Sequence, residues 1–388
     1  MGIDPSKYMA MHKSENKTLS ETSIALICSG LGNQSRGFET FFENLSTKIK
    51  NLFNVTLIKG GGKSSAKEIN LPHIKRDSWI LGGPGSKISW GKRYKLEQFS
   101  FFIPLSFHLL LNKYDIVQVS DPELAICLDS FKRVFKRKFK VVFTNAFPVE
   151  ANFYKSRFDL IQQVSKYYYD DSLSKGVGEG KMKLIPYATD GSRFSPPTQE
   201  QKITLRKKYD IPNDKMVILS VGSMDFSFKR MDYLIREISS LKNDAFLLIA
   251  GQENQETKVV KDLGRNLLGR NVKFATVKST DMHEIYKTAD IFALCSLKEG
   301  FGMVFIEAMS SGLPVIAHNH PNMSWILGNC AKLMDLGKIG ELKAGILELT
   351  QQRQMLENLS RNARKRAVEN FSWDSVINQY KAMYENLT

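Results

Sequence analysis

The sequence has few cysteines and no long apolar run. Its four cysteines, Cys28, Cys127, Cys295 and Cys330, are scattered without paired spacing. This argues against a disulfide framework or a structural zinc site and fits a reducing, cytoplasmic compartment. The longest apolar stretch, residues 99–111, is shorter than the roughly 20 residues that span a bilayer, and we expect a buried helix there. Residues 1–20 lack the apolar segment of a signal peptide, and we expect a disordered extension.

Negative charge is also scarce. The chain has 55 Lys and Arg residues against 40 Asp and Glu residues, a formal net charge of +15. Such a balance is typical of binding to nucleic acid, an anionic membrane surface or an acidic acceptor, and also of a merely lysine-rich composition. The sequence shows no clear nucleic-acid motif, because helix-turn-helix, zinc-finger and RNP-like strings are missing. A basic protein that binds or modifies nucleic acid stays an alternative.

What the sequence does contain is a regular alternation of short apolar runs and helical segments. A length of 388 residues suits two domains. Short strands that end in turns and alternate with helices predict an α/β fold with parallel sheets and crossover helices. We expect strands at residues 22–30, 54–60, 114–120 and 139–145 of the first half and at 216–222, 245–251, 272–277, 289–296 and 313–319 of the second.

The domain bounds follow from this rhythm and from a stretch rich in Pro, Ser and Thr. We expect a first domain at residues 21–195, a linker at 196–214, a second domain at 215–370 and a final amphipathic helix at 371–388. Two doubly wound domains predict a central cleft, with ligands at the carboxyl ends of the parallel strands.

The strongest chemical signal is the string EGFGMVFIEAMSSGLPVIA, which begins at Glu299. Gly300 and Gly302, on either side of Phe301, let the backbone approach a ligand closely. A helix that starts near Gly302 would offer unpaired N–H groups to a phosphate. Glu307, about one turn into that helix, could accept hydrogen bonds from a ribose, and Glu299 could hold sugar hydroxyls. A helix cap with a surface glutamate would explain either acid but not the whole string.

This string resembles the donor motif of the retaining glycosyltransferases of family four, which have the GT-B architecture. Four further strings are similar to family segments in the expected order: SRGFETFFENL from Ser35, FDLIQQVSKYYYD from Phe158, KMKLIPYATDGSRFSPP from Lys181 and VGSMDFSFKRMDYLI from Val221. The resemblance covers roughly residues 22–385 and ends in FSWDSVINQY, which is like the family's C-terminal helix that returns to the first domain. It implies two Rossmann-like doubly wound domains that face a cleft.

The resemblance also implies a reaction and its donor. It indicates transfer of a hexose from a nucleotide-sugar, UDP-sugar favoured over GDP-sugar, to an acceptor hydroxyl with an α-linked product. Lys229 matches the family's phosphate lysine, although a solvated lysine at a helix start would look the same. Gly37 fits the turn glycine where a side chain would block the donor phosphates. Gly222 and Ser223 follow the strand before Lys229, and backbone atoms at Val277 would hold the nucleobase.

Two departures from the family pattern bear on activity. The arginine expected shortly after Gly222 is missing, and Arg230 and Arg36 are candidate replacements. Histidine, common in the family after two first-domain strands, is also missing, and Asp121 is the best remaining acid on the acceptor side. Asp121 could orient or partly deprotonate the acceptor hydroxyl, or it could simply cap a helix. These losses keep open a catalytically silent partner subunit as a second alternative.

The remaining sequence features concern cofactors and the acceptor. They favour neither a metal ion nor a dinucleotide, and they do not identify the acceptor. His318 and His320 have the spacing of a metal pair without a convincing third ligand, so we expect a substrate contact or a plain loop. The string GLGNQSRG does not fit the Gly-x-Gly-x-x-Gly turn of a dehydrogenase, because its third glycine is not at the required position. The basic residues 132–140 and the apolar residues 99–111 could dock peripherally on an anionic membrane at its inner face, which would suit a lipid-linked acceptor.

Overall fold

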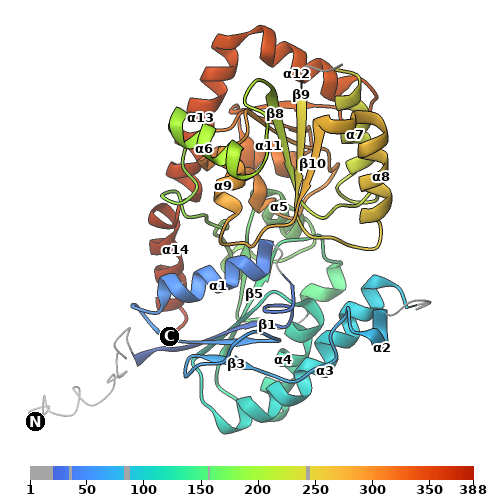
Figure 1. Ribbon diagram of the computed structural model, residues 1–388. Coiled ribbons are helices and arrows are strands. Elements are labelled where there is room, and N and C mark those ends of the chain that lie inside the picture. The colour runs from blue at the N-terminus through green and yellow to red at the C-terminus, as the bar shows by residue number, and fades with distance from the viewer. Residues whose placement is uncertain (1–20, 35–36, 83–87, 156–157, 242–244) are drawn as a thin grey trace, which may run out of the picture. The chain divides into compact units, whose positions relative to one another are not determined.

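The computed structural model describes residues 21–34, 37–82, 88–155, 158–241 and 245–388, so the predicted extension at 1–20 lies outside the described residues. The chain divides into two compact units. One comprises residues 1–32, 42–142 and 381–388, and the other residues 33–41 and 143–380. The prediction of a two-domain α/β fold with parallel, Rossmann-like sheets is confirmed (Figure 1), while the domain bounds proposed from the sequence stay a prediction.

The first sheet has seven strands in the order β3-β2-β1-β4-β5-β6-β7. β1 pairs in parallel with β2 and β4, β2 with β3, and β6 with β7. The apolar runs that predicted β1, β2, β4 and β5 are buried almost throughout. The strands are β1 (Ser23–Cys28), β2 (Asn54–Lys59), β3 (Glu68–Asn70), β4 (Ile116–Val119), β5 (Lys140–Asn145), β6 (Leu160–Gln163) and β7 (Met182–Leu184).

Five α-helices connect these strands. Pro122 stands in the first turn of α4, where its missing N–H costs nothing, and Ser165 caps α5 by accepting from the Tyr168 amide. The helices are α1 (Gly37–Ile49), α2 (Trp79–Gly82), α3 (Trp90–Leu111), α4 (Pro122–Val134) and α5 (Lys166–Ser174), with 3-10 turns η3 (Ala151–Lys155) and η4 (Glu179–Lys181).

Helix α3 differs from the expectation of a buried helix. Phe101, Leu105 and Leu109 are buried, but Ile103 and Phe107 on another face are 61% and 63% exposed. Within the described ranges, no helix has the length and apolar character needed to cross a bilayer. Composition predicted that α3 is apolar but could not predict that only one of its apolar faces is covered.

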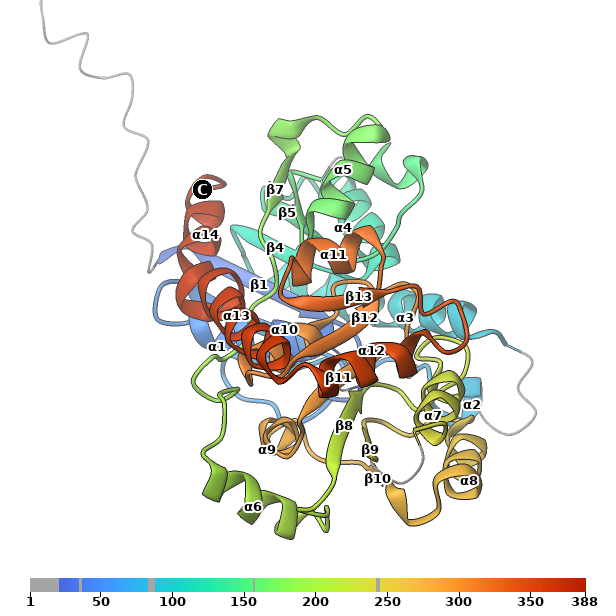
Figure 2. The same cartoon turned by 90° about the horizontal axis from the view of Figure 1, so that it is seen from above.

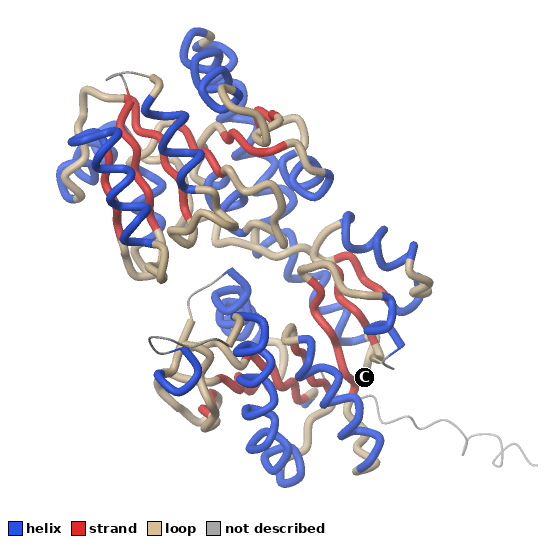
Figure 3. The backbone as a smooth tube through the Cα atoms, turned by 90° about the vertical axis from the view of Figure 1, so that its right-hand side faces the viewer, coloured by secondary structure: helices blue, strands red, loops and turns tan. Residues whose placement is uncertain are grey.

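The second sheet has six strands, all parallel, in the order β10-β9-β8-β11-β12-β13. This is the doubly wound order, in which the chain starts in the middle and reverses between β8 and β11. Figure 3 shows these strands side by side between helices. The strands are β8 (Met216–Val221), β9 (Ala245–Ala250), β10 (Val272–Ala275), β11 (Ile291–Leu294), β12 (Val315–His318) and β13 (Ala331–Met334).

Helices pack on this second sheet around a single core. Leu234 of α7, Ile249 of β9 and Ile346 of α12 belong to that core and are fully buried. α7 and α8 lie side by side, and α10 packs on α13 (Figure 2). The helices are α7 (Met231–Ser239), α8 (Thr257–Leu268), α9 (Met282–Lys287), α10 (Met303–Ser310), α11 (Pro321–Leu327), α12 (Glu341–Gln351) and α13 (Arg353–Phe371), with the 3-10 turn η5 (Gly269–Asn271).

Two segments outside the sheets have defined structure. The stretch proposed as a linker contains helix α6 (Gln199–Lys208), which opens with a capping box between Thr198 and Gln201. The last helix, α14 (Trp373–Glu385), contacts the first sheet: the Tyr384 hydroxyl donates to Gln118 of β4, and the Gln162 amide of β6 donates to the Tyr380 hydroxyl.

Candidate donor site

The site predicted around Lys229 and Glu299 lies at the switch point of the second sheet. β8 ends at Val221 and its neighbour β11 ends at Leu294, and the loops that follow carry the two residues. The Lys229 ammonium donates to Glu299 Oε1 over 2.6 Å. The two side chains are only 13% and 6% exposed. Residues 70 positions apart are therefore brought together at the place where doubly wound sheets bind ligands.

The loop that presents Lys229 is held by Asp225, which the sequence reasoning missed. Asp225 Oδ1 accepts from the backbone N–H groups of Phe228 (2.9 Å) and Lys229 (2.6 Å). An aspartate that closes a turn on amides three and four residues ahead is a recognisable local signal. A Cβ at Gly222 would lie 3.0 to 3.2 Å from the Lys229 stem, so this glycine makes room for the lysine. Ser223 Oγ accepts from the Asn254 amide at 2.8 Å.

The loop from Glu299 to Gly302 is held by two buried side chains. The Tyr168 hydroxyl donates to the Glu299 carbonyl (3.0 Å), and Asn322 Nδ2 donates to the carbonyls of Glu299 (3.0 Å) and Gly300 (2.6 Å). Because a trans peptide holds its C=O and N–H antiparallel, the N–H groups of Gly300 and Phe301 face the other way. Within the described parts of the chain, neither N–H finds an acceptor. Neither Tyr168 nor Asn322 was predicted.

Glycine is required where this loop enters α10. Gly302 has φ +82°, and a Cβ there would meet the Phe305 ring at 2.6 Å. A Cβ at Gly300 would lie 2.6 Å from the Ala146 carbonyl oxygen, and one at Gly37 would lie 2.9 Å from Met303. The start of α1 therefore lies against the start of α10. Two helix N-termini, each with unpaired N–H groups, meet at this point.

Glu307 lies in α10 and is bonded to a buried tyrosine. The Tyr286 hydroxyl donates to Glu307 Oε2 over 2.7 Å. Burial raises the pKa of Glu307 to about 7, and the Tyr286 hydrogen bond and the Arg193 charge only partly oppose this rise. The carboxyl is thus close to half-ionised at neutral pH and can change charge when a ligand donates hydrogen bonds to it.

The remaining predicted residues of the second unit lie further from the pair. Val277 follows β10, which β9 separates from β8. Arg230, proposed as a replacement cation, donates to the carbonyls of Leu336 (2.6 Å) and Cys295 (3.3 Å), and its guanidinium lies 4.5 Å over the Tyr233 ring. Arg36 lies outside the described residues. Arg230 is therefore engaged in holding neighbouring backbone.

Asp121 belongs to the first sheet, at its own switch point between β1 and β4. It precedes α4 without a side-chain capping bond. Instead, Oδ1 accepts from the Tyr94 hydroxyl (2.6 Å) and Oδ2 from the Ser29 amide (2.9 Å). The side chain is fully buried, and this burial raises its pKa. Both oxygens are thus used to hold the end of β1 and the start of α3.

The two candidate metal histidines have structural partners. His318 Nδ1 accepts from the Leu336 amide at 3.1 Å, and His320 Nδ1 accepts from the Asn322 amide at 3.2 Å. The part of the chain that the structure describes contains no cluster of three His, Cys, Asp or Glu residues able to hold a metal ion. The histidines order the loop after β12, from which Asn322 reaches the Glu299 carbonyl.

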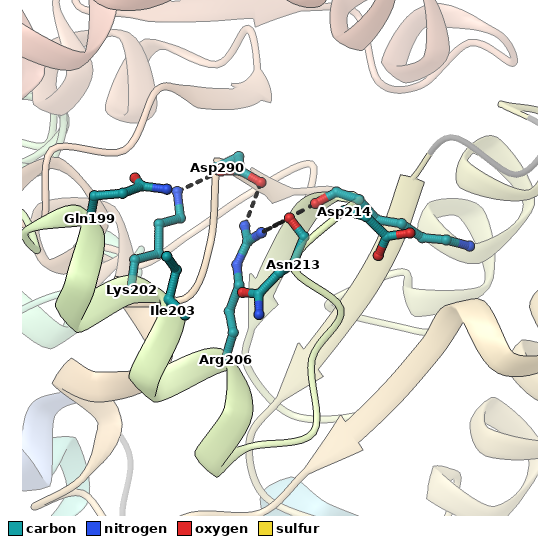
Figure 4. Close-up of a pocket in the computed structure, with 8 residues that line it drawn as sticks. Gln199, Lys202, Ile203, Arg206, Asn213, Asp214 and Asp290 are labelled. Atoms are coloured by element: carbon teal, nitrogen blue, oxygen red, sulfur yellow. Dashed lines mark hydrogen bonds and ion pairs between the residues drawn. The ribbon is translucent and has the colours of Figure 1, made fainter.

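A cavity of about 340 Å³ lies at the opposite ends of β8 and β11 (Figure 4). Asp290, just before β11, is paired with both Lys202 and Arg206 of α6. Asp290 Oδ2 also accepts from the Val217 amide, and Arg206 donates to the Thr288 carbonyl. These groups satisfy one another, and the cavity is at the amino ends of the strands. It therefore does not have the position of a ligand site in a doubly wound sheet.

One protein-family model matches a large part of the second half of the chain. Residues 201–366 match the model of the glycosyl transferases group 1. The chain is 27% identical over 217 residues to an MMP alpha-(1->4)-mannosyltransferase of Mycolicibacterium hassiacum, covering 54% of this chain and 49% of that protein. It is 29% identical over 227 residues to a mannosylfructose-phosphate synthase of Agrobacterium fabrum, covering 55% and 49%. The chain thus aligns with about half the length of these curated relatives.

Solved structures extend the likeness to the whole fold. A sucrose-phosphate synthase of Thermosynechococcus elongatus matches with a TM-score of 0.78 at 18% identity, covering 95% of this chain and 99% of that one. HepE of Anabaena, solved with UDP and glucose, matches with a TM-score of 0.74 at 15% identity, covering 94% and 100%. At these identities the likeness shows the fold alone, which is the GT-B architecture predicted from the sequence.

Proposed function

We propose that the chain is a retaining glycosyltransferase, because residues 201–366 match the model of the glycosyl transferases group 1. It moves a hexose from a UDP- or GDP-sugar to an acceptor hydroxyl, with an α-linked product. The observation that carries the proposal is the Lys229–Glu299 pair at the switch point of the second sheet, beside the unsatisfied N–H groups of Gly300 and Phe301. A cation, a carboxylate and free N–H donors are the groups that a sugar diphosphate requires.

Lys229 and the helix N-termini would stabilise the leaving diphosphate. Negative charge develops on the diphosphate as the bond to the sugar breaks, and preorganised cations and N–H groups lower the barrier. When the donor binds, the Lys229 ammonium exchanges its Glu299 partner for phosphate oxygens. Gly37, which already lies against Met303 at the start of α10, keeps the approach to these N–H groups free of a side chain. Retention by departure and attack on one face requires no protein nucleophile.

The two glutamates would hold the rest of the donor. Glu299, released from Lys229, accepts hydrogen bonds from sugar hydroxyls, and the N–H groups of Gly300 and Phe301 donate to the same sugar or its phosphate. Glu307 accepts from the ribose diol. Gly222, Ser223 and Gly302 leave the backbone accessible, and backbone atoms at Val277 contact the nucleobase.

On the acceptor side, the contacts of Asp121 favour a positioning role. Both its oxygens already accept hydrogen bonds from protein groups, which leaves them poorly placed to take a proton from an acceptor hydroxyl. We therefore propose that Asp121 shapes the acceptor pocket through Tyr94 and Ser29. Asp121→Asn can still accept from the Ser29 amide with its oxygen while its NH2 group donates to the Tyr94 hydroxyl, so it should then keep most of the turnover.

The donor base and the compartment are also proposed. UDP is favoured because HepE, which shares the fold, was solved with UDP and glucose, and GDP-sugars are the second choice. Cys28, Cys127, Cys295 and Cys330 are all free thiols, as in proteins of a reducing cytoplasm.

The proposal is tested by thermal unfolding with UDP, GDP, ADP and dTDP, each added separately in large excess. A ligand at a hundred times its dissociation constant stabilises the folded state by about 2.7 kcal/mol, which shifts the melting temperature by several degrees. A shift with UDP or GDP, followed by hydrolysis of the matching nucleotide-sugar, supports the proposal. A shift without hydrolysis of any sugar nucleotide favours a silent partner subunit, and no shift with any nucleotide contradicts the donor site.

A further inference from the structure

Helix α3 carries two apolar faces, and the structure covers one of them. Gln98, Phe101, Leu105 and Leu109 are buried, and α3 packs against α4. The other face, hereafter the α3 stripe, consists of exposed residues that follow one another at intervals of three and four, the spacing of one helical face: Leu96, Phe99, Ile103, Phe107 and Leu110. A helix that is apolar all round and yet half exposed is typical of a binding surface.

The end of α4 continues this surface. The Phe131 ring meets Phe102 of α3 edge-on at 6.1 Å. Arg137, just beyond α4, donates to the Leu109 carbonyl at 2.6 Å and to the Asn112 carbonyl at 3.2 Å. The two helices are thus fixed to each other at their C-terminal ends, as the cyan ribbons of Figure 1 show. Val134 and Phe135, 73% and 51% exposed, add apolar area beside the α3 stripe.

The exposed charged residues around the stripe are basic, although Lys95 is paired with the partly buried Glu123 and Arg133 with the buried Asp129. The only acidic residue of α3 is Glu97, and it is fully buried against Arg76. Asp129, the only acid from residue 124 to residue 140, is buried as well. The exposed charged residues of these segments are basic: Lys92, Lys95, Lys113, Arg133, Lys136, Lys138 and Lys140. Lys92 falls in line with the stripe, four residues before Leu96.

We propose that the α3 stripe and the adjoining cations dock the protein on an anionic phospholipid surface, with α3 lying in the plane of the interface. A helix with exposed Leu and Phe side chains and Lys and Arg residues at its rim is suited to the boundary between headgroups and acyl chains. Each cation near such a surface adds attraction to anionic lipid. Docking of a second copy is disfavoured, because it would bring two basic surfaces together.

This inference does not depend on the transfer reaction. It states where the first unit meets a membrane and leaves the donor chemistry unchanged, so a vesicle assay can fail while the transferase assay succeeds, and the reverse.

The test is co-sedimentation of the full chain with vesicles of phosphatidylcholine alone and of phosphatidylcholine with 30 mol% phosphatidylglycerol, about one anionic lipid in three. We expect binding to the anionic vesicles at low salt, weaker binding as salt screens the cations, and little binding to the neutral vesicles. Ile103→Ser with Phe107→Ser should lower the partition coefficient by at least roughly tenfold. Both substitutions remove the favourable free energy of moving an apolar side chain from water into the membrane. Lys136→Ala should lower it by about fivefold.

The matched control is Ile203→Ser with Val259→Ser, which removes two exposed apolar residues of α6 and α8 (46% and 56% exposed). It should bind vesicles like the unchanged protein. The melting temperature of every variant shows that it is folded. The proposal would be overturned if the unchanged protein did not bind anionic vesicles, or if Ile103→Ser with Phe107→Ser bound them equally well. It would also be overturned if the unchanged protein were a dimer and this variant, but not the control, were a monomer.

Discussion

The strands β8 and β11 carry ion pairs at both ends, and the two ends differ in how completely their polar groups are satisfied. At the amino ends, Asp290 is bonded by Lys202, Arg206 and the Val217 amide. At the carboxyl ends, Lys229 and Glu299 pair with each other beside two N–H groups that lack an acceptor in the described residues. The first arrangement joins α6 to the second sheet, whereas the second leaves N–H groups unused, as the proposed donor site requires.

The largest expected effect is a loss of stability when Asp290, at the amino ends of β8 and β11, is replaced. Asp290→Ala leaves Arg206, which is 5% exposed, without its carboxylate, and removing one partner of a buried pair costs about 3 kcal/mol or more. For a domain of this size the melting temperature should fall by roughly 6–12 °C. Turnover per folded molecule should stay unchanged below the transition. If Asp290→Ala lost turnover without losing stability, the amino ends of the strands would have a function, which contradicts the structural role given to Asp290.

The next largest effect is a loss of nucleotide-sugar affinity when Lys229, at the carboxyl ends of β8 and β11, is replaced. Lys229→Met removes the phosphate cation, so affinity for the nucleotide-sugar should fall about 100-fold, as expected for a charge-assisted contact of nearly 3 kcal/mol. Affinity for the free nucleoside should hardly change. Titration calorimetry with both ligands measures the difference, and Lys207→Met on the exposed side of α6 is the matched control. Equal losses for both ligands would remove Lys229 from the phosphate site.

The positioning of the Glu299 loop gives a smaller effect. Tyr168→Phe removes one donor to the Glu299 carbonyl, while Asn322 keeps the other. We expect kcat/KM for the nucleotide-sugar to fall about tenfold, one hydrogen bond's worth, with nucleoside affinity preserved. Tyr167→Phe, next to it on α5, changes a ring that contacts His320 instead and serves as the control. If the two variants behave alike, Tyr168 has no positioning role.

The smallest effect is a pH dependence set by Glu307. Burial raises its pKa to about 7, so the carboxyl is mostly neutral at pH 6 and mostly ionised at pH 8. The ionised form is the better acceptor for ribose hydroxyls, and nucleotide affinity should rise a few-fold, at most about tenfold, over this range. The same raised pKa means that this group's contribution to folding stability is largest below its unfolded pKa and declines as pH rises through 7. Glu307→Gln should flatten both profiles.

Much of the fold could be predicted because its signals are local. MVILSV and AFLLIA are continuous apolar runs, and they became the buried strands β8 and β9. The site could be predicted in part, since the string from Glu299 resembles a known donor motif. That motif named Glu299 and Glu307, and the string from Val221 named Lys229, but neither predicted that Lys229 and Glu299 bond to each other.

The rest was out of reach for physical reasons. Tyr168 and Asn322 act on backbone carbonyls far away in sequence, and a backbone acceptor leaves no trace in residue types. Asp121 was predicted as an acceptor-side acid from its place after a strand, but burial and two hydrogen bonds decide its chemistry, and both depend on tertiary contacts. The exposed stripe of α3 was predicted to be buried, because an all-apolar helix does not show which face its neighbours cover.

The comparison between the two ends depends on Glu299 as a group that leaves its lysine for a sugar. The most direct test uses a nucleotide-sugar that the unchanged protein hydrolyses. It measures the turnover of this substrate by Glu299→Gln and the affinity of the variant for the nucleoside diphosphate. We expect a loss of at least about 100-fold in kcat and a change of no more than about threefold in diphosphate affinity. The melting temperature should fall less than for Asp290→Ala, because the new amide oxygen can still accept from Lys229. Full turnover by Glu299→Gln would contradict this role of Glu299.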